Sequence, residues 1–75
     1  MGKLPAVTSK EVVRVLKKLG FFEDRQKGSH LILIHSETKR RVVVPMHQGK
    51  TIKKPLLAAI IKDAEVSIHS FLDLL

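Results

Sequence analysis

The sequence contains no cysteine among its 75 residues, which excludes both a disulfide framework and a zinc site built from thiolates. It has no apolar run close to the roughly 18 to 20 residues that a membrane-spanning helix needs. Its first residues also lack the apolar stretch of a signal peptide. We therefore expect a single small domain over residues 1–75, located in the cytoplasm, with one thin core and no membrane segment.

Acidic side chains are scarce in the central part of the chain. The whole sequence has 14 Lys and Arg residues against 7 Asp and Glu residues, a formal net charge of +7. Between residues 25 and 54 the one acidic residue is Glu37, whereas eight are basic: Arg25, Lys27, Lys39, Arg40, Arg41, Lys50, Lys53 and Lys54. The flanking segments are neutral overall. This concentrated excess favours a polyanionic partner such as RNA or DNA, and a basic surface kept for solubility is the alternative.

A first helix is predicted to begin after Thr8. Thr8 and Glu11 have the spacing of a capping box, in which each side chain accepts a hydrogen bond from the other residue's backbone N–H. Apolar residues then recur on one helical face, at Val12, Val15, Leu16 and Leu19. Gly20 suits the left-handed conformation that commonly ends a helix.

The period of the apolar residues then changes to two, which predicts three strands, over residues 21–25, 30–35 and 40–44. Residues 27–29 and 36–39 are the expected turns. Pro45 is expected to stop the third strand because it has no N–H to donate. Since short turns make neighbouring strands antiparallel, the second strand should be central.

The second strand is apolar on both of its expected faces. One face has His30, Ile32 and Ile34, and the other has Leu31, Leu33 and His35. A sheet that is wet on one side would instead alternate with polar residues. A homodimer or a bound partner protein would cover the second face, and a few tolerated surface aliphatic residues are the alternative.

Two further helices are predicted toward the C-terminus. Pro55 suits the first position of a long helix, whose apolar stripe is Leu57, Ile60, Ile61 and Ala64. Ser67 can cap a short last helix, whose apolar positions are Ile68, Phe71, Leu72 and Leu75. The predicted fold class is therefore α+β: a helix, a three-stranded antiparallel sheet and a helix, in the order of the double-stranded-RNA-binding domain, with a short C-terminal helix.

Three local motifs point to a known family. They are Leu19-Gly20-Phe21, Lys27-Gly28-Ser29-His30, and Val44-Pro45 followed by His47. In order and spacing they resemble the HicA family of toxins, and the resemblance extends from about Thr8 to Phe71. It implies a ribonuclease toxin of a type II toxin–antitoxin system that cleaves mRNA, with the histidine of Gly-Ser-His, here His30, at the catalytic centre. It also implies a HicB-type antitoxin protein as partner, which would block the basic face and His30.

The chemistry that the resemblance implies is reasonable for these residue types. RNA carries its own nucleophile in the 2′-hydroxyl, so an enzyme needs only to move protons and stabilise a charged phosphorane, and imidazole suits the proton transfer. Lys27 is the first candidate for the contact with the phosphate. Gly28 can adopt a positive φ and bring backbone N–H groups close to a phosphate, to which Ser29 can add its hydroxyl. For residues 27–29 alone, an ordinary hairpin turn is the alternative.

Other candidates for RNA binding are spread over the basic segment: Arg25, Arg41, His47, Lys50, Lys53 and Lys54. For His47, an ordinary surface histidine is the alternative. His35 should point away from His30, so the two are not expected to act as a pair. The sequence departs from the family at Pro55-Leu56, where Gly-Thr is common, at Ala58, where a basic residue is common, and at Glu65, which replaces a usual glycine.

No metal site and no cofactor are predicted. The histidines at 30, 35 and 47 do not have the spacing of a zinc site, so we expect a metal-independent endoribonuclease. A noncatalytic RNA- or DNA-binding module of the same fold is the main alternative, and a protein that only recruits an acidic partner is another.

Overall fold

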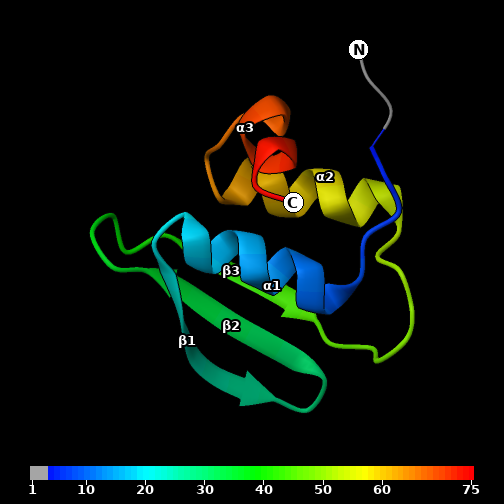
Figure 1. Cartoon of the computed structure of the whole chain (residues 1–75). Coiled ribbons are helices and arrows are strands. Elements are labelled where there is room, and N and C mark those ends of the chain that lie inside the picture. The colour runs from blue at the N-terminus through cyan, green and yellow to red at the C-terminus, as the bar shows by residue number, and fades with distance from the viewer. Residues whose placement is uncertain (1–3) are drawn as a thin grey trace.

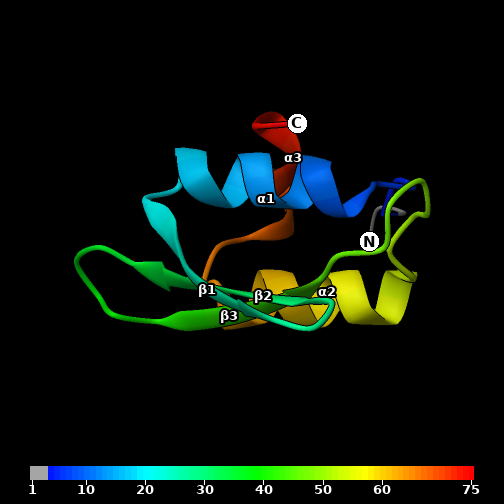
Figure 2. The ribbon, with the colours of Figure 1, turned by 90° about the horizontal axis from the view of Figure 1, so that it is seen from below.

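The computed structural model describes residues 4–75 and contains three helices and three strands: α1 (Ser9–Lys18), β1 (Phe21–Lys27), β2 (His30–His35), β3 (Arg41–Pro45), α2 (Lys54–Asp63) and α3 (Ile68–Asp73). The strands form one antiparallel sheet in the order β1-β2-β3, so β2 is central. Helix α1 lies over one face of this sheet, while α2 runs beside β3 (Figures 1 and 2). The predicted α+β fold, with the element order of the double-stranded-RNA-binding domain, is confirmed.

Helix α1 begins with the predicted capping box. The Thr8 side chain accepts a hydrogen bond from the backbone N–H of Glu11 at 3.2 Å, and the Glu11 carboxylate accepts one from the N–H of Thr8 at 2.9 Å. The bond from the Thr8 N–H, with a second one that the Thr8 hydroxyl donates to the same carboxylate at 3.2 Å, favours the ionised form and lowers the pKa of Glu11 from 4.5, its ordinary value. The buried side of the helix contributes four residues to the core: Val12, Val13, Val15 and Leu16.

The register of the sheet corrects three predicted boundaries. Strand β1 continues to Lys27, which pairs with His30, so the turn contains only Gly28 and Ser29 and not residues 27–29. Gly28 has φ +58°, as expected for glycine at the first position of a tight two-residue hairpin turn. Strand β3 covers Arg41–Pro45 instead of residues 40–44. Pro45 can end this strand within the sheet because β3 is an edge strand, where a missing N–H is tolerated.

The two faces of β2 have different environments. Leu31 and Leu33 belong to the main core, together with Val42 and Val44 of β3. Ile32 lies on the opposite face, outside this cluster, yet only 5% of it is exposed. Side chains of the sheet itself therefore cover part of the second face. The sequence alone predicts either a partner that covers this face or a few aliphatic residues tolerated at the surface.

The end of α1 is fixed by His35, the last residue of β2. The His35 Nδ1 atom accepts hydrogen bonds from the backbone N–H groups of Glu37 and Thr38, at 3.1 and 3.2 Å. The ring hydrogen is therefore on Nε2, which donates to the Leu19 carbonyl oxygen at 2.9 Å. Gly20 passes so close that a Cβ there would lie 2.7 Å from Nε2. The Leu19-Gly20-Phe21 motif is thus a packing motif around His35.

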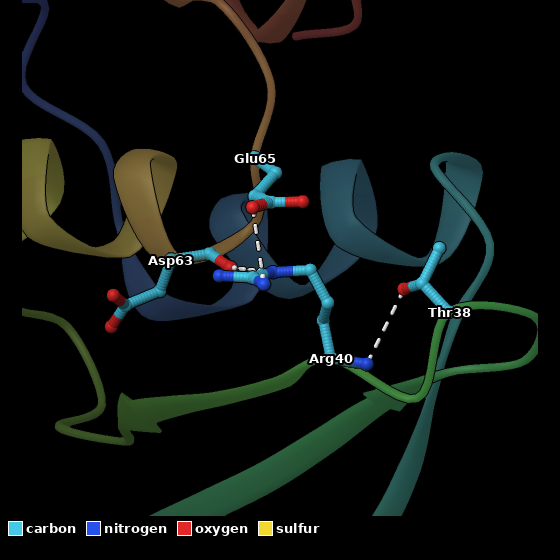
Figure 3. Close-up of polar contacts among 4 residues, drawn as sticks. All are labelled: Thr38, Arg40, Asp63 and Glu65. Atoms are coloured by element: carbon cyan, nitrogen blue, oxygen red, sulfur yellow. Dashed lines mark hydrogen bonds and ion pairs between the residues drawn. The ribbon is translucent and has the colours of Figure 1, made fainter.

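Helix α2 begins at Lys54, one residue before the predicted start at Pro55, and its C-terminal end is held by Arg40 (Figure 3). The guanidinium donates a hydrogen bond to the Asp63 carbonyl oxygen at 3.0 Å and forms an ion pair with Glu65 at 3.1 Å. Glu65 has φ +58°, a conformation that favours glycine.

Helix α3 packs on the core through Phe71, which is fully buried. Its first turn is capped as predicted, because the Ser67 side chain accepts a hydrogen bond from the N–H of Ser70 at 3.0 Å. None of the helices within residues 4–75 has the length and apolar character that crossing a membrane requires.

Candidate active site

His30 is the first residue of β2 and is exposed to solvent. It is opposed by Lys27 on β1 and by Pro45 on β3. Directly opposed residues of an antiparallel sheet share a face, with Cβ atoms about 4.5–5.5 Å apart. The imidazole of His30 and the ammonium group of Lys27 therefore project from the same face of the sheet at neighbouring positions, at the end where the hairpin turn lies.

The Gly28-Ser29 turn beside His30 is held by contacts from two directions. The side-chain amide of Gln26 donates to the Gly28 carbonyl oxygen at 3.1 Å, and the backbone N–H of Met46 donates to the Ser29 carbonyl oxygen at 2.6 Å. No atom lies within 4 Å of the place where a Cβ of Gly28 would be. Glycine is therefore favoured here by its positive φ and not by lack of space, and the space beside the turn is open to a ligand.

His47 follows β3 in a loop that Ser9 fastens to the start of α1. The Ser9 hydroxyl donates to the Pro45 carbonyl oxygen at 2.5 Å and accepts a hydrogen bond from the His47 N–H at 3.5 Å. Ser9 is 5% exposed, so these contacts are shielded from water. The loop and the start of α1 together form a cavity of about 390 Å³, lined by residues 8–10 and 46–49. The side chain of His47 belongs to the wall of this cavity and is exposed.

The predicted RNA-binding residues fall into two groups. The first lies along one side of the molecule, from the β1–β2 turn at the bottom of Figure 1 through the loop after β3 to the start of α2 further up. It comprises Lys27, Gly28, Ser29, His47, Lys50, Lys53 and Lys54, all exposed. The second consists of Arg25 and Arg41, which lie further along the sheet in the rows of Ile32 and Ile34. The structure does not gather all of them around His30.

His35 is separated from His30, as expected, because its ring packs between Leu19 and the turn after β2. Within residues 4–75, no three His, Cys, Asp or Glu side chains are grouped so that they would hold a metal ion. Sequence reasoning missed Ser9, which fastens the loop with His47, and Phe22, which is exposed on the face of the sheet that carries His30. Ser9 gives no recognisable signal because its partners are 36 and 38 residues away. Phe22 was detectable, since alternation after Phe21 places it on the opposite face.

A comparison with curated proteins finds no match for this chain. The profile of the HicA toxins of bacterial toxin–antitoxin systems matches residues 9–66. The match covers well over half of the chain and extends from α1 through α2, so it includes His30, the hairpin turn and the loop with His47. The chain therefore belongs to the HicA family, whose members are the ribonuclease toxins of toxin–antitoxin pairs.

Proposed function

We propose that this protein is an endoribonuclease that cleaves mRNA without a metal ion, with His30 as the catalytic residue. One observation carries the proposal: His30 is exposed at the hairpin end of the central strand, with Lys27 directly opposite it on the same face. A buried histidine without a cation nearby would not fit this chemistry. The exposed pair provides a proton carrier and a positive charge beside a surface that an RNA backbone can reach.

The proposed reaction uses the 2′-hydroxyl of the substrate. This hydroxyl gives its proton to the imidazole of His30, and its oxygen attacks the adjacent phosphorus. The bond from phosphorus to the 5′-oxygen of the next nucleotide breaks, that oxygen takes up a proton, and a 2′,3′-cyclic phosphate remains. The ammonium group of Lys27 stabilises the negative charge on the phosphorane, and N–H groups of the Gly28-Ser29 turn can add to it.

RNA is held mainly through its phosphates in this proposal. The exposed cations Arg25, Arg41, Lys50, Lys53 and Lys54, with His47, supply the contacts. Contacts of this kind carry no base specificity of their own, and the affinity they give falls steeply with salt. An mRNA substrate also implies that the protein acts in the cytoplasm.

The partner in the toxin–antitoxin pair is proposed to be an acidic HicB-type antitoxin protein that covers His30 and the basic surface. A net charge of +7 on 75 residues favours rapid association with an acidic protein. The antitoxin would thereby exclude RNA from Lys27 and His30 at the same time.

The test compares the purified wild-type protein with His30→Ala on a labelled single-stranded RNA, with EDTA present. We expect wild-type protein to cleave and the variant to lose at least about 100-fold in rate, because proton transfer by a side chain contributes about 10²- to 10⁴-fold. His69→Ala is the matched control, since His69 is an exposed histidine on α3 (88% of its side chain). It should cleave at the wild-type rate.

Binding is measured in parallel, and His30→Ala should keep most of the RNA affinity. An RNA with a 2′-deoxy nucleotide on the 5′ side of the cleaved bond should bind and resist cleavage. Equal rates for wild type and His30→Ala would refute the role of His30. RNA binding by the wild type without any cleavage would instead identify a noncatalytic binding module.

A further inference from the structure

The face of the sheet opposite α1 is covered by no helix of residues 4–75 (Figure 2). The register places nine residues on this open face, in three rows that cross the strands. The rows are Lys27, His30 and Pro45; then Arg25, Ile32 and Val43; then Phe22, Ile34 and Arg41. Successive rows are about 6.6 Å apart, because they are separated by two strand residues of about 3.3 Å each. His30 therefore belongs to the same surface as Ile32 and Ile34.

Charge on the open face is of one sign. Each row contains one cation, namely Lys27, Arg25 and Arg41 in turn, and none of the nine positions is acidic. The nearest acid, Asp24, lies in the bulge of β1 between two paired residues, and its contact with Arg25 is an exposed one at 3.6 Å. Exposed pairs of this kind hold their side chains weakly. The three cations are thus available to a chain of phosphates that crosses the rows toward His30.

Apolar side chains lie between these cations. Phe22 is 46% exposed and Val43 38%, whereas the other two phenylalanines, Phe21 and Phe71, are almost fully buried. Phe22 is therefore the exposed phenylalanine of residues 4–75. It is in the row furthest from His30, opposite Ile34 of β2, which separates it from Arg41 of β3. An exposed aromatic ring among cations is the arrangement that proteins use to stack unpaired bases while binding the backbone.

We propose that the open face of the sheet is a platform for single-stranded RNA, with a base stacked on Phe22 and phosphates at Arg41, Arg25 and Lys27. This arrangement leads the RNA to His30. The proposal rests on the ribonuclease function proposed above and names its substrate as unpaired RNA. A duplex would not fit, because its bases are already stacked and paired and could not lie on Phe22. A second copy of the chain fits poorly, because a two-fold contact would place three cations against three cations.

The first test uses the absence of tryptophan from the sequence. Phe22→Trp introduces a single fluorophore on the open face, in a His30→Ala background that prevents cleavage. Titration with a short mixed-sequence single-stranded RNA should quench the fluorescence saturably, and the same sequence annealed to its complement should quench it much less. Leu75→Trp is the matched control, because Leu75 is a large apolar residue of similar exposure, 38%, that follows α3 and lies outside the basic segment. It should show little quenching.

The second test is Phe22→Ala in the active protein. Loss of one stacked base should weaken the affinity for single-stranded RNA by about 5- to 150-fold, with the thermal midpoint nearly unchanged because the ring is exposed. Phe22→Trp in the same active protein should keep the wild-type affinity, because the indole can stack on a base as the phenyl ring does.

Three results would overturn the inference. They are RNA binding that leaves the fluorescence of the Phe22→Trp variant unquenched, equal quenching by duplex, and a fluorescence change that follows protein concentration without RNA, which would identify a dimer interface. Each of these leaves cleavage by His30 intact, so the proposed function survives. The opposite outcome is also distinguishable. If single-stranded RNA quenches the introduced indole but the wild-type protein never cleaves RNA, the RNA-binding platform is supported and the nuclease proposal is refuted.

Discussion

Replacement of Gly20 by alanine should be among the most destabilising single changes that add only one methyl group. Gly20 has φ +103°, outside the regions that alanine prefers, and the new Cβ would lie 2.7 Å from the Nε2 atom of His35. A left-handed backbone costs about 1–2 kcal/mol in a residue with a Cβ. Displacement of the His35 ring weakens its three hydrogen bonds and adds about 1–2 kcal/mol in total.

The sum is about 2–4 kcal/mol, a large part of the roughly 4–11 kcal/mol expected for a domain of this size. Urea denaturation followed by far-UV circular dichroism measures it directly. Gly28→Ala is the matched control, because Gly28 also has a positive φ, +58°, but no atom within 4 Å of a Cβ. It should cost only the backbone part, about 1–2 kcal/mol.

A double-mutant cycle separates the two causes. In a His35→Ala background the ring that Cβ would meet is absent, so Gly20→Ala should cost only its backbone part. The coupling free energy between the two changes should therefore be about 1–2 kcal/mol. If Gly20→Ala costs the same in both backgrounds, within about 0.5 kcal/mol, the contact with His35 does not explain the glycine and the packing argument is wrong.

Two further predictions concern the contacts around α1. The pKa of Glu11 is lowered in the folded protein by its hydrogen bonds with Thr8, so its ionised form stabilises the fold above pH 4.5 and this contribution is lost as the pH falls below that value. Urea midpoints against pH should fall more steeply for wild type than for Glu11→Gln, and parallel curves would contradict the capping box. Ser9→Ala leaves the Pro45 carbonyl oxygen without its buried donor and should lower the free energy of unfolding by about 1–3 kcal/mol. Ser36→Ala, at an exposed position, should change little, and equal effects would show that the Ser9 contacts are unimportant.

The elements of this fold were predictable because their signals are local. The capping box of Thr8 and Glu11 marks the start of α1, and alternation of apolar residues marks β2, whose bounds were right. The wrong strand boundaries lie where the pairing between strands determines the boundary. Whether Lys27 belongs to the turn or to β1 depends on its partner His30, and whether Pro45 ends β3 or follows it depends on β3 being an edge strand.

The contacts that position the candidate site were less accessible to sequence reasoning. Ser9 looks like an ordinary first-turn residue of a helix, and only the folded chain brings its hydroxyl to the Pro45 carbonyl oxygen. His35 was correctly placed away from His30, but its hydrogen bonds with Leu19 and the turn after β2 could not be read from spacing. Interactions of this kind depend on how elements pack, which local patterns do not encode.

Glu65 stands at a position where the family resemblance leads us to expect glycine. Its φ of +58° is one that glycine adopts without strain, and its carboxylate is paired with Arg40. This contact fastens the end of α2 to the segment between β2 and β3, at the end of the sheet away from His30 (Figures 1 and 3). Glu65 therefore bears on the folding of the chain and does not touch the proposed site.

The motifs that identify the family divide into two physical classes. Gly20 and Phe21 pack around His35, whose ring meets Phe21 edge-on with the centroids 5.1 Å apart. Gly28, Ser29 and His30, by contrast, are exposed. Substitutions in the first class should lower activity only as far as they lower the fraction of folded protein, so ligands or conditions that stabilise the fold should restore it. Substitution of His30 removes no packing contact of the core, so the loss of activity should persist in a fully folded protein. This difference distinguishes residues that act in the reaction from residues that stabilise the fold.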